Sequence, residues 1–177
     1  MPEIDVRKNP WIQGHPREEQ LVNREVYNLL AIFAASQTLA ERRTSQNGGC
    51  VYSWSIQSFE YVEIGRILVS VAAMLRNDWD AFPSRAEQNL STVGRAPQVG
   101  VLITDIERPA KAVPLTVRES FNKILHAHTL NLERSEGRSL TSGYLLPRVH
   151  LYGEHRGEQW KATIEIYEWA ELVHAIS

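Results

Sequence analysis

Apolar residues recur every three to four positions in two long stretches of the chain, which is the spacing of an amphipathic helix. The first stretch runs from Arg17 to about Arg43, and its apolar positions are Val22, Val26, Leu29, Leu30, Phe33 and Ala40. The second runs from about Ser55 to Asn77, and its stripe is Tyr61, Ile64, Leu68, Val71 and Leu75, widened by Ile67 and Met74. The segment Ser45-Gln46-Asn47-Gly48-Gly49 between them favours a turn. The pattern therefore predicts a long helical hairpin whose two stripes face each other.

In the middle of the chain, between residues 78 and 114, the pattern predicts one strand. The helical pattern disappears between Asp78 and Pro97, which indicates a long loop or a loop that contains a short helix. The β-branched run from Val99 to Ile106 then favours a buried strand. Pro109 and Pro114 bracket a loop after that strand.

A third helix is predicted to begin beside Thr116, because Thr116-Val117-Arg118-Glu119 has the residue types of a capping box. In this motif the Thr116 hydroxyl accepts a hydrogen bond from the Glu119 amide, and the Glu119 carboxylate accepts one from the Thr116 amide. We expect the helix to continue to about Leu130 or Leu132, before a loop at Glu136-Gly137-Arg138.

The C-terminal part changes from helical spacing to alternation. Residues 148–152 alternate, the segment from Gly153 to Gly157 interrupts the pattern, and residues 160–167 alternate again. This predicts a β-hairpin with one half-buried face, with Pro147 at the start of its first strand or on an edge. Residues 168–175 return to helical spacing, which predicts a short helix that closes over the sheet.

Together these elements predict an α+β fold. It consists of a long helical hairpin, a third helix, a small antiparallel sheet that includes the C-terminal β-hairpin, and a short terminal helix. The length of 177 residues is typical of one domain, so we expect a single domain over residues 1–177. Residues 1–15 are mostly polar and have no sustained period, so they are expected to form an N-terminal arm.

Composition limits the partners and the compartment. The chain has 19 basic and 21 acidic side chains, a formal charge of −2, so any action on RNA must rest on a small local site. No apolar run approaches the roughly 20 residues that span a bilayer, which predicts no membrane helix. The single cysteine, Cys50, cannot form an internal disulfide and no secretory signal begins the sequence, so we expect a cytoplasmic protein. Glycine-loop, nucleophile-elbow and zinc motifs are absent from the sequence, so no cofactor is expected.

The candidate chemistry lies on the third helix. Arg118, Asn122 and His126 follow one another at i, i+4 and i+8 along one flank. A guanidinium can hold a phosphate through paired donors. An imidazole with a pKa of about 6.5 can take a proton from a ribose 2′-hydroxyl or give one to the leaving oxygen. This chemistry needs no metal. The same flank could instead be solvated surface, or a polar seam that fixes the helix in place.

A second histidine, His128, would lie in the middle of the apolar face if the helix continued, so we expect it to be partly buried and to donate to a carbonyl. It would point about 200° away from His126, so the two could not share a metal on an intact helix. An aromatic platform for a base, made of Trp160, Tyr152 and Tyr144, is a further alternative. Packing of Trp160 into the helical layer is the expected use of that residue.

The segment from Arg118 to His126 resembles the motif region of HEPN domains, helical proteins common in bacterial toxin and phage-defence systems. In that family an arginine precedes a histidine with four to six residues between them. Residues 122–126 resemble the segment that follows the family arginine. The closest alignment puts that arginine at position 121, which is a phenylalanine here. Arg118 is the arginine present, and seven residues separate it from His126. The resemblance implies a metal-independent endoribonuclease that acts as a homodimer. It assigns proton transfer to His126, orientation of substrate or imidazole to Asn122, and stabilisation of the phosphate to Arg118.

Two functions remain open at this point. The first is the RNA-cleaving enzyme that the resemblance implies. The second is a non-catalytic interaction or structural protein, with another protein as partner, in which the Asn122 and His126 stripe is a structural polar seam. An exposed His126 beside a basic group favours the first function, whereas a buried and hydrogen-bonded His126 favours the second.

Overall fold

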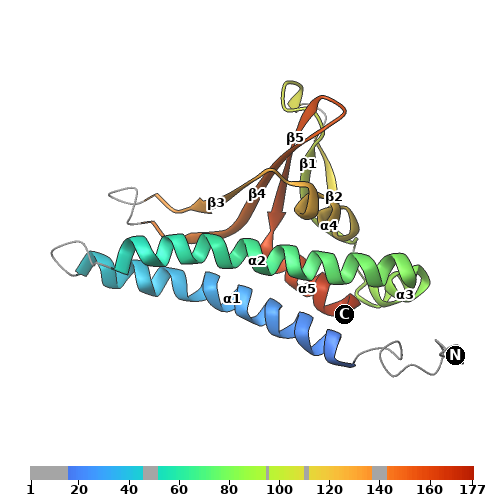
Figure 1. Cartoon of the computed structure of the whole chain (residues 1–177), viewed down its shortest axis with the longest axis horizontal. Helices are drawn as coiled ribbons and strands as arrows, with labels where there is room; N and C mark the ends of the chain where they lie inside the picture. The colour runs from blue at the N-terminus through green and yellow to red at the C-terminus, as the bar shows by residue number, and fades with distance from the viewer. Residues whose placement is uncertain (1–15, 46–51, 95, 110–111, 137–142) are drawn as a thin grey trace, which may run out of the picture.

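Two long helices, α1 (Pro16–Ser45) and α2 (Tyr52–Ala81), run antiparallel along the base of the molecule (Figure 1). The computed structural model describes residues 16–45, 52–94, 96–109, 112–136 and 143–177, apart from the side chains of residues 16–19, 43–45 and 52–57. The predicted arm (1–15), the turn residues 46–49 and Cys50 lie outside the described residues. The helical hairpin is confirmed.

Most residues of the predicted stripes are buried in the core, where α2 packs on α4 as well as on α1, while Leu30 and Met74 are partly buried. The buried members are Val22, Val26, Leu29, Phe33, Ala40, Ile64, Ile67, Leu68, Val71 and Leu75. Tyr61 is the exception, because its side chain is 45% exposed and its hydroxyl donates a hydrogen bond to the carbonyl of Leu130, at 2.7 Å. The prediction that Tyr61 belongs to the buried stripe is therefore wrong.

A five-stranded antiparallel sheet rises from this base, in the order β2-β1-β5-β4-β3. The strands are β1 (Gln98–Ile103), β2 (Ala112–Thr116), β3 (Thr129–Arg134), β4 (Leu145–His155) and β5 (Glu158–Glu165). The predicted C-terminal hairpin is β4 and β5, and its two-residue loop has positive φ at Arg156 (52°) and Gly157 (82°), the geometry that suits the twist of paired strands. With five helices in the described part of the chain, the fold is α+β, as predicted.

In the region 78–97 the predicted alternative of a short helix is confirmed, as α3 (Pro83–Thr92), and three other segments differ from the predictions. The prediction of a loop from Pro109 to Pro114 is wrong, because β2 begins at Ala112. Pro114 is compatible with β2 because this strand lies at the edge of the sheet, where a proline is tolerated. Pro147 lies inside β4, but beyond the last residue paired with β5 and opposite an irregularity in β3. β1 ends at Ile103, and its Val101 is 42% exposed, so this strand is buried on one face only.

The third helix, α4 (Val117–His126), begins as predicted and ends early. The hydroxyl of Thr116 accepts from the amide of Glu119 at 3.2 Å. Ala127 then turns to an extended conformation, and residues 129–134 pair with β4 as β3. The prediction of a helix to Leu130 or Leu132 is wrong, because sheet pairing takes over the backbone at His128, whose amide donates to the carbonyl of Tyr152 at 2.8 Å.

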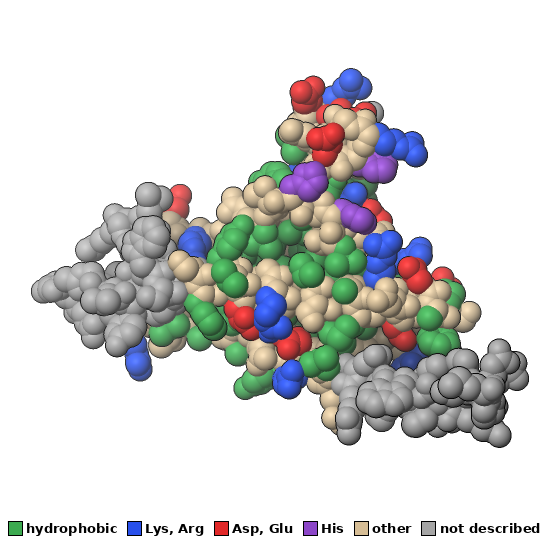
Figure 2. All heavy atoms as spheres, viewed as in Figure 1, with side chains coloured by type: hydrophobic (Ala, Val, Ile, Leu, Met, Phe, Trp, Pro, Cys, Tyr) green, Lys and Arg blue, Asp and Glu red, His purple; other side chains and the backbone are tan. Residues whose placement is uncertain are grey.

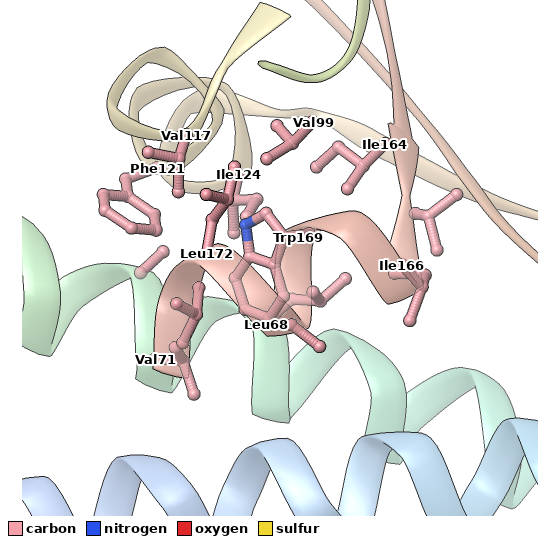
Figure 3. Packing of buried hydrophobic residues seen from close by; sticks show 14 of the residues in the cluster. Leu68, Val71, Val99, Val117, Phe121, Ile124, Ile164, Ile166, Trp169 and Leu172 are labelled. Carbon is pink, nitrogen blue, oxygen red and sulfur yellow. The ribbon is translucent and has the colours of Figure 1, made fainter. Parts of the chain in front are cut away.

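The last helix, α5 (Ile166–Ile176), joins the sheet to the hairpin. Its Trp169 is fully buried and lies among side chains of α2, α4 and β5 (Figure 3). One face of the sheet is covered in this way by α4 and α5, and carries Val149, Leu151, Trp160, Ala162 and Ile164. The opposite face carries polar side chains that are half-buried or exposed. Among the described residues, no helix is both long enough and apolar enough to cross a bilayer.

Candidate functional site

The side of α4 that faces away from the core carries the predicted residues. Val117, Ser120, Phe121 and Ile124 are buried, and at about 100° per residue His126 lies nearly opposite to them. His126 is exposed at the last residue of the helix, and no hydrogen bond of its imidazole is found within the described part of the chain. An exposed imidazole at a helix end is free to meet a ligand.

Arg118 is held at the other end of α4. Its guanidinium lies 3.2 Å from Asp80 of α2 and 6.0 Å from the ring centre of Trp79. Both members of the ion pair are more than half exposed, so the pair itself contributes little stability. His126 follows Arg118 by eight positions, which is about 12 Å along the helix axis. The structure therefore keeps all three predicted residues on one helix but does not bring Arg118 next to His126.

Asn122 and Lys123 are the polar neighbours of His126 one turn earlier. The Asn122 amide donates to the Glu119 carboxylate at 3.1 Å. The Lys123 ammonium lies 3.4 Å from the same carboxylate and 4.6 Å from the ring centre of Trp160. Sequence reasoning missed Lys123, although its i−3 spacing from His126 could have indicated it. Lys123 is the cation nearest to His126 along the helix.

The early end of α4 changes the position of His128. The side chain is exposed and lines a polar pocket of about 180 Å³ together with Ile106, Thr129, Tyr152, Gly153, Glu154 and Gln159. The prediction that His128 is partly buried on the apolar face is therefore wrong. Figure 2 shows histidine side chains gathered on the projecting part of the molecule, beside α4.

Gly153 sets how closely the end of α4 approaches β4. A Cβ at this position would lie 2.3 Å from the ring of Trp160 and 3.0 Å from the carbonyl oxygen of His126. Only glycine fits without a shift of the helix end or of the indole. Because Gly153 also lines the polar pocket, His126 ends its helix beside that pocket.

The exclusion of a shared metal depended on an intact helix through His128, and the helix ends first. Within the described residues, no group of three or more His, Cys, Asp or Glu side chains is placed to hold a metal ion.

Comparisons with protein-family models, with curated proteins and with solved structures find no match to this chain. The site is therefore interpreted from its own geometry.

The open face of the sheet holds a second polar cluster, which sequence reasoning missed. His150 on β4 lies between two partners: its Nδ1 is 3.0 Å from the Thr163 hydroxyl and its Nε2 is 3.1 Å from the Glu133 carboxylate. Arg148 bridges Glu133 and Glu165 beside it. The imidazole thus has a hydroxyl on one ring nitrogen and a carboxylate on the other, an arrangement that enzymes use to transfer a proton from the hydroxyl. The same bonds also tie β3, β4 and β5 together.

The alternative aromatic platform is divided between the two faces. Trp160 is buried under α4, which confirms its expected packing. Tyr152 lies on the other face, with the Lys161 ammonium 5.6 Å from its ring centre. Trp160 and Tyr152 therefore cannot stack on the same base.

Burial lowers the pKa of His150, and the charges of Lys161 and Arg148 act in the same direction, against the carboxylate of Glu133. Above the free histidine pKa of about 6.5, His150 is neutral in the folded and unfolded chains. Below it the unfolded chain binds the proton more readily, so the free energy of unfolding falls as the pH drops through the folded-state pKa. We expect urea unfolding between about pH 8 and pH 5 to show this loss, and a His150→Gln variant to show a flatter profile. An equally steep profile in the variant would assign the loss to other groups.

Proposed function

We propose that this protein is a metal-independent endoribonuclease of the cytoplasm, in which His126 transfers a proton at the ribose 2′-hydroxyl or at the leaving oxygen. The observation that carries the proposal is the exposed His126 imidazole at the end of α4, one turn from Asn122 and Lys123. The resemblance of residues 118–126 to HEPN domains of toxin and defence systems supports the same reaction. It also supports a homodimer as the active form.

The roles follow from position. His126 lies where its imidazole can reach a bound RNA strand from solvent. Asn122 can orient the imidazole or the substrate once the Glu119 carboxylate is displaced or shared, because its amide carries a second donor. Lys123 is closer than Arg118 to a phosphate at His126, because Arg118 lies about 12 Å away along the helix. Both cations have a carboxylate partner in the fold, Glu119 for Lys123 and Asp80 for Arg118, which a phosphate must displace or share.

The direct test is cleavage of RNA by the pure protein in excess EDTA. A matched oligonucleotide with 2′-deoxyribose at the cleaved position separates attack by the 2′-hydroxyl from other chemistry. We expect cleavage of the RNA, products that end in a 2′,3′-cyclic phosphate, and no cleavage at the deoxy position. A preparation that leaves mixed RNA intact under these conditions would refute the proposal.

Substitution of Lys123 is expected to affect the cleavage rate much more than substitution of Arg118. Lys123→Ala is expected to lower the cleavage rate about 10- to 100-fold, the usual effect of losing one hydrogen bond to a charged group. Arg118→Ala should change it by less than about threefold. Lys123→Arg, which keeps the charge, serves as the control. The initial rate of cleavage of a fluorescent oligonucleotide measures all three. A larger loss in Arg118→Ala would return the phosphate role to the arginine that the resemblance assigns.

The alternative function is a non-catalytic protein that binds another protein. Its structural form, a polar seam made by Asn122 and His126, has little to support it: the Asn122 bond stays within α4, and His126 is exposed. Its interaction form is favoured by a different observation, an apolar surface on the helical hairpin. An intact RNA substrate together with an identified protein partner would decide for this alternative.

A further inference from the structure

A groove of about 620 Å³ runs between α1 and α2 on the helical hairpin. Five residues of α1 and three of α2 line it: Asn28, Ala31, Ile32, Ala35, Leu39, Phe59, Glu60 and Glu63. Figure 2 shows hydrophobic side chains exposed along these two helices. We refer to this surface as the α1–α2 groove.

The groove has the shape of a seat for a helix. Its α1 side runs from Asn28 to Leu39, which is about 16 Å or three helical turns. Ala31 and Ala35 are exposed on that side, and side chains this small allow another backbone to approach closely. Phe59 on the other side is 67% exposed. Because the groove is open along its length, it suits a helix better than an enclosed small molecule.

Among the buried side-chain atoms of the described residues, one oxygen of Glu60 is the only one without a hydrogen-bond partner. The side chain of Glu60 is only 5% exposed, and one carboxylate oxygen accepts from Arg134 at 2.8 Å. The other oxygen, Oε1, is buried and has no hydrogen-bond partner, a situation that is rare in folded proteins. Glu25, the other buried glutamate of the hairpin, is paired with Arg66 at 2.6 Å. Glu60 lines the groove, so a donor that a ligand brings would satisfy its Oε1 once the side chain turns outward.

We propose that the α1–α2 groove binds an amphipathic helix of a partner protein, which places apolar residues at i, i+4 and i+7 along α1 and one lysine or arginine against Glu60. The apolar lining matches the stripe, and the unpartnered oxygen of Glu60 matches the cation, because the carboxylate of Glu63 is already paired with Arg66 at 2.6 Å. This inference does not depend on the nuclease, because α4 and His126 form no part of the groove.

The test is selection from a phage-displayed library of 15-residue helical peptides, randomised on one face, against the wild-type protein. Counter-selection uses Ala35→Arg, which fills the groove. The matched control is Ala34→Arg, because Ala34 is also exposed on α1 but does not line the groove. We expect enriched peptides with an apolar stripe and one basic residue, which bind wild type and Ala34→Arg equally and Ala35→Arg at least about tenfold more weakly.

Glu60→Gln then tests the cation in fluorescence-anisotropy titrations of one enriched peptide and of the same peptide with its basic residue changed to glutamine. Wild type should prefer the basic peptide about tenfold, and Glu60→Gln should bind the two equally. If Glu60→Gln does not fold, the Ala35→Arg comparison still decides. Enriched peptides without a basic residue, or no enrichment that depends on Ala35, would overturn the proposal. So would a wild-type dimer that Ala35→Arg converts to monomer, because a second copy would then occupy the groove.

Discussion

Replacing His126 with alanine is expected to lower RNA cleavage by about 100- to 10,000-fold at neutral pH, the usual contribution of a positioned acid or base. The imidazole is exposed and hydrogen-bonded to no described group, so its removal should change the free energy of unfolding by less than about 0.5 kcal/mol. Single-turnover cleavage measures the first effect and urea unfolding the second. A loss of activity without a loss of stability separates catalysis from structure.

Two histidine controls sharpen this prediction. His155→Ala removes an exposed imidazole at the end of β4, outside α4 and the polar pocket, and should leave the rate unchanged. His128→Ala removes the imidazole that lines the pocket and shows whether a second histidine takes part. If His126→Ala cleaves RNA at the same rate as the wild type and the His155→Ala control, the proposed role of His126 is wrong.

The sequence was sufficient for the elements whose stability is local or periodic. The stripes of α1 and α2 are long, so their periodicity could not be confused with that of strands. The start of α4 was predictable because its cap is encoded within four residues, and Thr116 does accept from the Glu119 amide. The second half of the capping box, a hydrogen bond from the Thr116 amide to the Glu119 carboxylate, was predicted wrongly. The Glu119 carboxylate instead lies against Asn122 and Lys123.

The end of α4 could not be predicted, because it is decided by a distant strand. Val117, Phe121, Ile124 and His128 fit one helical face, so the pattern alone favours continuation. The alternation at Leu130 and Leu132 is too short to compete until β4 is present to pair with them. In the fold, Leu130 lies opposite Leu151 and Leu132 opposite Val149. The backbone amides and carbonyls of this segment therefore form their hydrogen bonds with β4 instead of within a longer helix.

The candidate site was predicted only in part for the same reason. The helix flank that carries Arg118, Asn122 and His126 follows from spacing alone. The Asp80 partner of Arg118, the exposure of His128 and the cluster around His150 follow from contacts between segments far apart in the sequence. Glu133 reaches His150 only through the pairing of β3 with β4, and the pattern predicts the first residues of β3 as the end of the third helix, with no strand at Glu133.

Trp169→Ala is the substitution with the largest expected effect on stability, a loss of about 3–5 kcal/mol. The indole is fully buried where α5 meets α4, with its ring centre 6.5 Å from that of Phe121 in an edge-on arrangement (Figure 3). Its Nε1 donates to the Ser120 hydroxyl at 3.0 Å, and that hydroxyl in turn donates to the carbonyl of Val117 at 2.6 Å. The alanine variant leaves a cavity and removes the bond that joins the two helices. Since a domain of this size is stable by only about 5–15 kcal/mol, a substantial share of the margin would be lost.

Trp169→Phe is the matched control, because it keeps an aromatic ring in the core and removes the indole donor. Urea unfolding should show a smaller loss than in Trp169→Ala, because the phenyl ring fills most of the space that alanine leaves empty. Both variants lose the indole bond, and in both the Ser120 hydroxyl keeps its bond to Val117. A loss below about 1 kcal/mol in Trp169→Ala would contradict the cavity argument. His126 points away from this core, so any RNA cleavage by Trp169→Phe should keep the wild-type rate wherever the variant is folded. Cleavage by Trp169→Ala should instead decline with temperature in step with the folded fraction, since α4 then loses the support that holds its outer side in place.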